Sequence, residues 1–225
     1  MTAVVRPLDP PRTVVVLAKA PVPGRVKTRL TARLTPAQAA DVAAAALADT
    51  LDAVAGLPGD HVLVLDGEPG PWVPRRFEVL PQSAGGLDDR LAAAFDDVFA
   101  RRPGPVLLVG MDTPQLAGEL AAVDLHGHDA VLGLAEDGGF WAVGLRSPDP
   151  ALFLGVPMSR PTTGAAQLER LRAHGLDVGL LPTLRDVDEP SDAEAVARDA
   201  PGTAFAHRWR EAVARTGRGA RTGRP

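Results

Sequence analysis

Four cationic side chains follow one short apolar run near the start of the chain. The run covers residues 13–17, and the loop after it carries Lys19, Arg25, Lys27 and Arg29 among prolines and a glycine. Such a run predicts a buried strand, and open α/β sheets bind ligands beyond the carboxyl ends of their strands. Four like charges so close together repel one another unless an anion joins them. The natural anion is a polyphosphate, so the loop predicts a nucleotide site.

Two carboxylates stand at the ends of later apolar runs. Asp112 follows the run 106–109, and Asp188 follows the run 178–181 as the second member of an Asp-Val-Asp pair. Hard divalent cations prefer oxygen ligands, so the two aspartates could hold one magnesium or manganese ion. Each aspartate could instead cap the helix expected after it. The fact that both stand at strand exits favours the metal site.

A third acidic loop contains Glu136, Asp137 and Gly138 ahead of the apolar run 140–145. The carboxylates could position an acceptor substrate, act as a general base or add a metal contact. The twin glycines allow the backbone to approach a ligand or to adopt a positive φ. The same residues are also ordinary turn formers, so a plain turn is the alternative.

Two further loops carry polar groups that could bind a substrate. Gln82 and Gly86 begin and end a glycine-containing stretch, and the side-chain amide of Gln82 could recognise a nucleobase. Thr162 and Thr163 stand where a helix is expected to begin, and helix N-termini bind phosphate and carboxylate groups. Threonines at this point can equally cap their own helix.

Several kinds of chemistry are excluded by what the sequence lacks. The chain has no cysteine, which excludes disulfides, thiolate metal sites and cysteine nucleophiles. Its five histidines are scattered and form no metal-binding spacing. A complete P-loop, a dinucleotide-binding glycine pattern and the Gly-x-Ser-x-Gly elbow of serine hydrolases are all missing.

The elements that must hold these loops alternate along the chain. Short Val- and Leu-rich runs predict buried strands over 13–17, 61–65, 76–80, 106–109, 130–134, 140–145 and 178–181. Helical spacing of apolar residues predicts helices over 37–55, 87–100, 117–123, 163–173 and 193–198. The alternation implies a three-layer α/β/α sandwich with a mostly parallel sheet. The run 140–145 follows its predecessor too closely for a crossover helix, so it should run antiparallel and make the sheet mixed.

The chain length and the net charge limit the number of domains and the kinds of binding partner. A chain of 225 residues suits one α/β domain with a full core. Its net charge of −4 provides no general field to recruit nucleic acid, and no run is long enough to span a membrane. We expect a cytoplasmic enzyme, and a homodimer is compatible with these features. Its expected parts are a flexible leader over 1–12, one domain over 13–214 and a disordered basic tail over 215–225.

Four motifs occur in a fixed order. They read KAPVPGRVKTRL from Lys19, GMDTP from Gly110, AEDGGF from Ala135 and DVDEP from Asp186. Together they resemble a bacterial family of uncharacterised proteins described as glycosyltransferase-A-like, which includes arsenosugar-biosynthesis glycosyltransferases. More distantly, the chain is similar to 2-phospho-L-lactate and phosphoenolpyruvate guanylyltransferases. The resemblance covers about residues 13–198.

The resemblance implies a nucleotide-diphosphosugar-transferase (GT-A-like) fold with a magnesium site. It implies that Asp112 and Asp188 are the metal ligands and that Lys27 and Arg25 neutralise the triphosphate. Residues matching the nucleotide-binding positions are Leu17, Ala18, Lys19, Gly24, Arg29, Gln82 and Gly86. The chain departs from the family at Met111, where relatives often carry serine, and around Pro190. These departures bear on the acceptor pocket.

Three functions are compatible with these residues. In nucleotidyl transfer, a nucleoside triphosphate and a small phosphorylated or carboxylated acceptor give an activated product and pyrophosphate, with catalysis by Lys27, Arg25 and Asp112. In glycosyl transfer, a nucleotide sugar is the donor, and Asp137 or Glu136 serves as the base. The third option is a nucleotide-binding protein without turnover. The cation-rich loop favours the first, because a triphosphate carries more negative charge than a sugar diphosphate.

Overall fold

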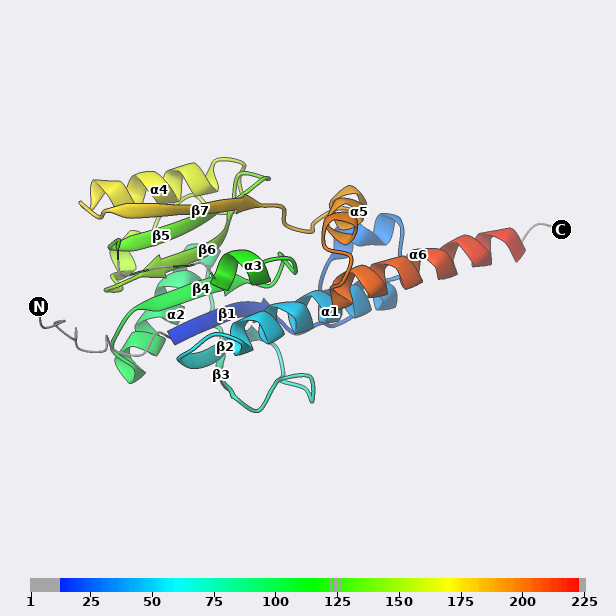
Figure 1. Ribbon diagram of the computed structural model, residues 1–225, viewed down its shortest axis with the longest axis horizontal. Coiled ribbons are helices and arrows are strands. Elements are labelled where there is room, and N and C mark those ends of the chain that lie inside the picture. The colour runs from blue at the N-terminus through cyan, green and yellow to red at the C-terminus, as the bar shows by residue number, and fades with distance from the viewer. Residues whose placement is uncertain (1–12, 122, 124, 126, 223–225) are drawn as a thin grey trace, which may run out of the picture.

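Seven strands form one sheet at the centre of the fold. The computed structural model describes residues 13–121, 123, 125 and 127–222. Along the sheet the order is β3-β2-β1-β4-β6-β5-β7 (Figure 1). The strands are β1 (Thr13–Lys19), β2 (Asp60–Asp66), β3 (Phe77–Pro81), β4 (Val106–Gly110), β5 (Ala130–Ala135), β6 (Phe140–Leu145) and β7 (Val178–Leu184). Every predicted strand is present, with ends shifted by up to three residues.

Strand direction decides which loops meet. β1 pairs in parallel with β2 and β4, β2 with β3, and β5 with β7. β6 runs antiparallel to both β4 and β5, which confirms the expected mixed sheet. The carboxyl ends of the six parallel strands and the start of β6 therefore share one edge of the sheet.

Six helices and two short 3-10 turns complete the part of the chain that the structure describes. They are α1 (Pro36–Ala55), α2 (Leu87–Arg101), α3 (Ala117–Ala121), α4 (Thr163–Ala173), α5 (Pro190–Asp199), α6 (Ala204–Thr222), η1 (Thr28–Ala32) and η2 (Pro150–Leu152). α1 begins where expected because the Thr35 side chain accepts from the Gln38 amide, the Gln38 side chain accepts from the Thr35 amide, and Pro36 fits the first helical turn.

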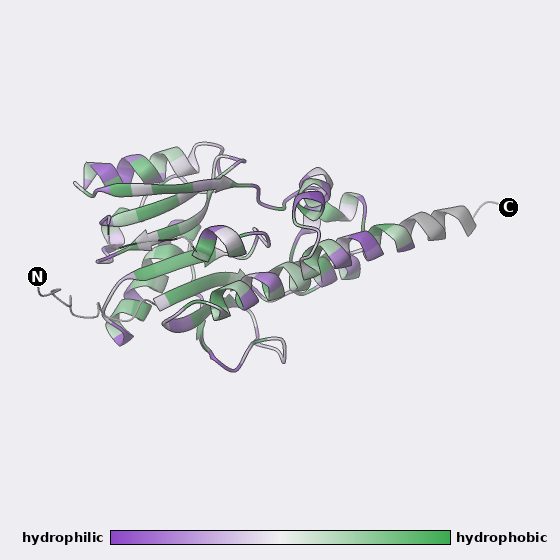
Figure 2. Cartoon of the chain, viewed as in Figure 1, coloured by the Kyte–Doolittle hydropathy of each residue, from purple (hydrophilic) through white to green (hydrophobic). Residues whose placement is uncertain are grey.

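Helices cover both faces of the sheet, which makes the expected three layers. Val14 and Val16 of β1 pack with α1 and α3 on one face, whereas Val15 packs with α2 and η2 on the other. α4 covers the second face through Leu171. The strands are mostly apolar along their length (Figure 2), as strands buried on both faces must be.

The C-terminal helices depart from the predicted elements. α5 starts at Pro190 instead of residue 193, and α6, which was not predicted, follows it and runs beside α1 (Figure 1). α6 continues to Thr222 through most of the segment expected to be a disordered tail, while the expected leader 1–12 lies outside the described residues. Phe205, Trp209 and Ala212 recur at helical spacing and are buried against α1 and α5, which explains why this segment is helical.

Within the described ranges, no helix combines the length and the apolar character needed to cross a lipid bilayer.

Candidate functional site

One cavity of about 700 Å³ opens at the shared edge of the sheet. Its volume suits a nucleotide-sized ligand. Loops after β1, β3, β4 and β7, the β5–β6 turn and the segment before α4 line it. The predicted residues on its wall are Leu17, Ala18, Lys19, Arg25, Lys27, Arg29, Gln82, Asp112, Asp137, Thr163 and Asp188. Gly24, Gly86, Glu136, Gly138 and Thr162 are absent from that wall.

The loop after β1 brings Lys27 into the centre of the site. Gly24 adopts a φ of 77°, and Lys27 itself has a φ of 47° and a ψ of 40°, in the left-handed region that side chains rarely occupy. Val26 and Leu30 on either side are buried, and the Leu30 amide donates to the Lys27 carbonyl at 3.0 Å. These anchors fix the Lys27 backbone and direct its side chain inward.

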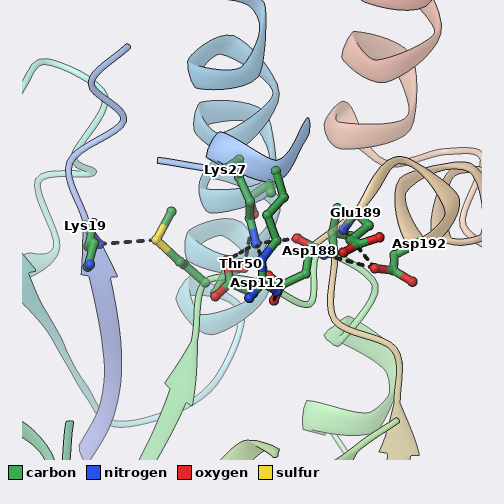
Figure 3. A network of polar contacts seen from close by, with 11 residues as sticks. Lys19, Lys27, Thr50, Asp112, Asp188, Glu189 and Asp192 are labelled. Carbon is green, nitrogen blue, oxygen red and sulfur yellow. Dashed lines mark hydrogen bonds and ion pairs between the residues drawn. The ribbon is translucent and has the colours of Figure 1, made fainter. Parts of the chain in front are cut away.

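Lys27 joins two carboxylates that are far apart in sequence (Figure 3). Its Nζ forms an ion pair with Asp112 Oδ1, lies 3.4 Å from Asp188 Oδ1 and donates to the carbonyl oxygen of Val187. Burial by itself lowers the pKa of Lys27, but the two carboxylates outweigh it and raise the pKa above its usual value. The lysine is therefore charged at neutral pH.

A second acidic group lies beside this pair. One carboxylate oxygen from each of Asp137, Asp186 and Asp188 lies within 4.8 Å of the others, and Asp188 belongs to both groups. Burial, with the charges of Asp137 and Asp188, raises the pKa of Asp186 to about 6. Carboxylates crowded in this way favour a bound cation. Their oxygens are the donors that magnesium and manganese prefer, so the residues present fit such an ion.

The remaining loop cations differ in their pairing. Arg29 Nη1 lies 2.9 Å from Asp188 Oδ2 and is largely exposed. Lys19 and Arg25 line the cavity without an ion pair to any described residue. The main-chain amide of Lys19 donates to the sulfur of Met111 at 3.2 Å, which ties the ends of β1 and β4 together (Figure 3). Lys19 and Arg25 are thus available to an anionic ligand.

The Gln82 side chain is turned toward the backbone. Its Nε2 donates to the carbonyls of Ala18, at 2.7 Å, and Val64, at 3.2 Å. Its Oε1 faces Arg90 Nη1 at 3.4 Å. Both amide protons are therefore occupied, and only the oxygen, beside the Arg90 guanidinium, remains for a base.

The acidic turn between β5 and β6 is held by a close approach of two backbone segments. Asp137 Oδ1 accepts from the Gly139 amide at 2.7 Å, and the Gly164 amide donates to the Gly138 carbonyl at 2.8 Å. Gly138 has a φ of 90°, and a Cβ there would lie 1.9 Å from the Pro161 carbonyl oxygen. Glycine is therefore required, for a structural reason and not for contact with a ligand.

The side chains of Glu136 and Thr163 have structural partners. Glu136 Oε2 pairs with Arg185 Nη2 at 2.6 Å. The Thr163 hydroxyl donates to the Pro157 carbonyl and accepts from the Arg160 amide, both at 3.0 Å. Thr162 forms no side-chain cap. Both Thr163 contacts are to the segment before α4 and not to the amides of α4, so neither threonine caps its own helix.

Sequence reasoning missed two cations on the cavity wall. Arg90 lies one turn into α2, and Arg160 lies on the segment clamped against Gly138. The Arg160 guanidinium forms no hydrogen bond or ion pair with the described residues. The signal for Arg160 was a charged residue between Ser159 and Pro161, directly before a helix start.

A comparison with protein families identifies the relatives of this chain. The family described as "uncharacterized protein conserved in bacteria (DUF2064)" matches residues 34–160. The match spans more than half of the chain, so the chain belongs to this family and the expected bacterial family is confirmed. No curated protein matches the chain.

A solved structure confirms the expected fold. A crystal structure of a "putative nucleotide-diphospho-sugar transferase" from Desulfovibrio desulfuricans G20 is 26% identical, covers 92% of this chain and 97% of its own, and has a TM-score of 0.83. Its description agrees with the transferase class expected from the sequence. A 2-C-methyl-D-erythritol 4-phosphate cytidylyltransferase from Thermus thermophilus is 18% identical over 81% of this chain and 98% of its own, with a TM-score of 0.47. At that score the second similarity supports no argument.

Proposed function

We propose that this member of the DUF2064 family is a magnesium-dependent nucleotidyltransferase. It transfers a nucleoside monophosphate from a nucleoside triphosphate to a small phosphorylated or carboxylated acceptor and releases pyrophosphate. The observation that carries the proposal is the division of charge in the cavity. Lys19, at the end of β1, and Arg25, in the loop after it, present unpaired positive charge, and the carboxylates of Asp112, Asp186 and Asp188 line the same cavity.

The cationic loop supports a triphosphate donor. Lys19 and Arg25 have no carboxylate partner among the described residues, and Lys27 and Arg29 follow them in the same loop. A bound triphosphate neutralises this concentration of charge, and pyrophosphate carries the charge that develops as it leaves. These side chains hold and stabilise the leaving group.

The acidic groups support a divalent ion. Asp112 and Asp188, with Asp186 and Asp137 beside them, are the residues that would hold it. When bound, magnesium supplies charge neutralisation at the reacting phosphate.

The reaction exchanges one phosphorus–oxygen bond for another. An oxygen of the acceptor's phosphate or carboxylate forms a bond to the α-phosphorus as the bond to the pyrophosphate oxygen breaks. An ionised acceptor brings no proton to remove, so the chain needs no general base and no covalent nucleophile. Positioning and electrostatic stabilisation supply the catalysis.

Arg160 supports an anionic acceptor. The segment that carries it is held by the hydrogen bond from the Arg160 amide to the Thr163 hydroxyl and by the close approach of Pro161 to Gly138. An anion entering beside Asp137 and Asp186 meets repulsion, which an unpaired guanidinium offsets. Arg160 therefore orients the acceptor's phosphate or carboxylate.

Glycosyl transfer from a nucleotide sugar is the second candidate, and the Desulfovibrio structure favours it by its description. One feature argues against glycosyl transfer: the residue two positions after Asp112 is Pro114 and not a second aspartate. The ligand of such an enzyme carries a diphosphate, which leaves part of the cationic loop unused.

A thermal-shift panel with magnesium tests the proposal. We expect nucleoside triphosphates to raise the melting temperature more than the matching nucleotide sugars, and pyrophosphate to appear when phosphorylated or carboxylated acceptors are added. Arg160→Gln should leave the triphosphate shift intact and weaken the acceptor-dependent release. Greater stabilisation by a nucleotide sugar would select glycosyl transfer. Triphosphate binding without release across the acceptor panel would select a non-catalytic binding protein.

A further inference from the structure

The Lys27 ammonium lies deeper in the protein than the carboxylates it joins. The side chain of Lys27 is 8% exposed, whereas those of Asp112 and Asp188 are 48% and 39% exposed. Figure 3 shows Lys27 reaching between the two aspartates from the loop above them. All three side chains line the cavity, and the lysine is the most buried of them.

All three protons of this ammonium have partners. An ammonium has three N–H donors and no acceptor. The contacts are one oxygen of Asp112, one oxygen of Asp188 and the carbonyl oxygen of Val187. No donor remains for a phosphate oxygen. Lys27 can therefore bind a phosphate only after it gives up at least one of these contacts.

A divalent ion would share these carboxylates with Lys27. Asp188 also belongs to the acidic group with Asp137 and Asp186, and Asp112 and Asp188 line the same cavity. The Lys27 ammonium contacts one oxygen of each aspartate and repels a second cation at short range. An ion held by Asp112 and Asp188 therefore competes with Lys27 for their negative charge.

The lysine can move without moving the loop. Its left-handed backbone is held by buried Leu30, whose amide donates to the Lys27 carbonyl at 3.0 Å. Leu30 and Val187 belong to one apolar cluster with α5 and α6, so the loop and the Asp186–Asp188 segment are joined behind the site. The four-carbon stem of lysine is flexible and can redirect the ammonium from this fixed base.

We propose that Lys27 is a positioning residue with two alternative sets of partners. Without metal and nucleotide, its ammonium pairs with Asp112 and Asp188. When these carboxylates coordinate a divalent ion, the lysine side chain moves and its ammonium contacts the phosphates of the nucleotide. Lys27 therefore weakens metal binding in the absence of nucleotide and favours joint entry of metal and nucleotide. The transfer to the phosphates rests on the proposed function, whereas the competition with a metal ion does not.

Manganese binding to the nucleotide-free protein tests the competition directly. Free Mn²⁺ is followed by electron paramagnetic resonance as it is titrated into the wild type and into Lys27→Met. Removal of the competing ammonium should tighten Mn²⁺ binding by at least about tenfold, a typical size for coupling between two ligands of one site. Unchanged or weaker Mn²⁺ binding by a folded Lys27→Met would overturn the proposal.

Arg29→Met is the matched control. It also removes one positive charge that contacts Asp188, but Arg29 is exposed and does not lie between the carboxylates. Its Mn²⁺ affinity should stay within about threefold of the wild type, as expected for an exposed ion pair. An equal gain in both variants would mean a general charge effect and would contradict the proposal. Lys27→Arg, which keeps a cation, should keep the weak affinity. If Lys27→Met does not melt cooperatively, Lys27→Gln is judged by the same tenfold criterion.

A non-hydrolysable nucleoside triphosphate separates this proposal from the proposed function. This analogue should tighten Mn²⁺ binding in the wild type more than in Lys27→Met, because only the wild type has an ammonium that can move to the phosphates. If Lys27→Met gains affinity but no triphosphate has this effect, the competition stands and the nucleotidyltransferase assignment fails. If triphosphates bind and pyrophosphate is released but Lys27→Met gains nothing, the assignment stands and the competition is wrong.

Discussion

Asp112 carries two contacts at once. Its side chain pairs with Lys27, and its carbonyl oxygen accepts from the Val187 amide at 2.9 Å, which joins the ends of β4 and β7. A change of the side chain alone therefore tests the chemistry while leaving the backbone link in place.

Asp112→Asn should lower pyrophosphate release at least about 100-fold, because the loss of a charged ligand removes several kcal/mol of transition-state stabilisation. The measurement is the initial rate at saturating triphosphate and magnesium. Asp199→Asn, which changes an exposed aspartate at the end of α5, should keep the wild-type rate. A near-normal rate in Asp112→Asn would refute the role of Asp112 as a ligand.

The raised pKa of Asp186 predicts that the stability of the protein depends on pH. Its pKa is raised from 3.8 to about 6 by burial and by the charges of Asp137 and Asp188, so the folded protein binds a proton that the unfolded chain has released. The free energy of unfolding should therefore fall as the pH rises from about 4 to 6. Asp186→Asn removes this penalty and should stabilise the protein by about 1–2 kcal/mol at pH 7, a value reduced for partial exposure.

Urea denaturation in EDTA, at pH 4 and pH 7, measures the effect of Asp186→Asn. The gain should be present at pH 7 and largely absent at pH 4, where the wild-type carboxyl is protonated. A variant that is less stable than the wild type at pH 7 would contradict the cause assigned to the shift.

At the scale of elements, the site depends on two segments held from behind. The turn between β5 and β6 is clamped to the segment before α4, and the loop after β1 is packed with α5 and α6 through Leu30, Val187 and Trp209. α6 begins on Asp49 of α1, whose carboxylate accepts from the amides of Ala204 and Phe205 at 2.8 and 2.7 Å. A helix distant from the cavity thus helps to fix the Asp186–Asp188 segment.

Gly138→Ala tests the clamp behind the acidic turn. A Cβ there would lie 1.9 Å from the Pro161 carbonyl, so the segment that carries Arg160 must shift. We expect a loss of more than about 2 kcal/mol of stability by urea denaturation. Gly155→Ala is the matched control, because Gly155 also has a positive φ, of 77°, but has open space around its Cβ position. It should cost only about 1 kcal/mol. Equal losses would show that backbone conformation and not the close approach decides.

At the scale of the molecule, the ligand site is assembled from loops spread over the whole chain. Residues from 17 to 188 line one cavity, so occupation of the cavity should stabilise the fold as a unit. At about 100 times its dissociation constant, a magnesium–triphosphate ligand adds about 2.7 kcal/mol. For a chain of this size that raises the melting temperature by about 5–10 °C. Scanning fluorimetry with and without EDTA measures the effect, and a shift that EDTA leaves unchanged would argue against the metal.

The sequence determined the strands, most of the helices and the position of every motif loop. Each of these elements was predicted from a local signal in the sequence. The signals are the spacing of apolar residues, the prolines and glycines at the ends of elements, and the short link before β6. The same signals missed α6: Phe205, Trp209 and Ala212 recur at helical spacing within the expected domain, but no helix was predicted there, and the basic residues from 215 onward were taken for a solvated tail.

Only the tertiary structure decided which charges meet. The sequence predicted that Asp112 and Asp188 would converge, but not that Lys27 lies between them, that Asp186 and Asp137 crowd Asp188, or that Arg90 and Arg160 reach the cavity. Lys27 and Asp188 are 161 positions apart along the chain. A contact over such a separation is set by strand order and by the packing of α5 and α6, which local sequence patterns do not encode.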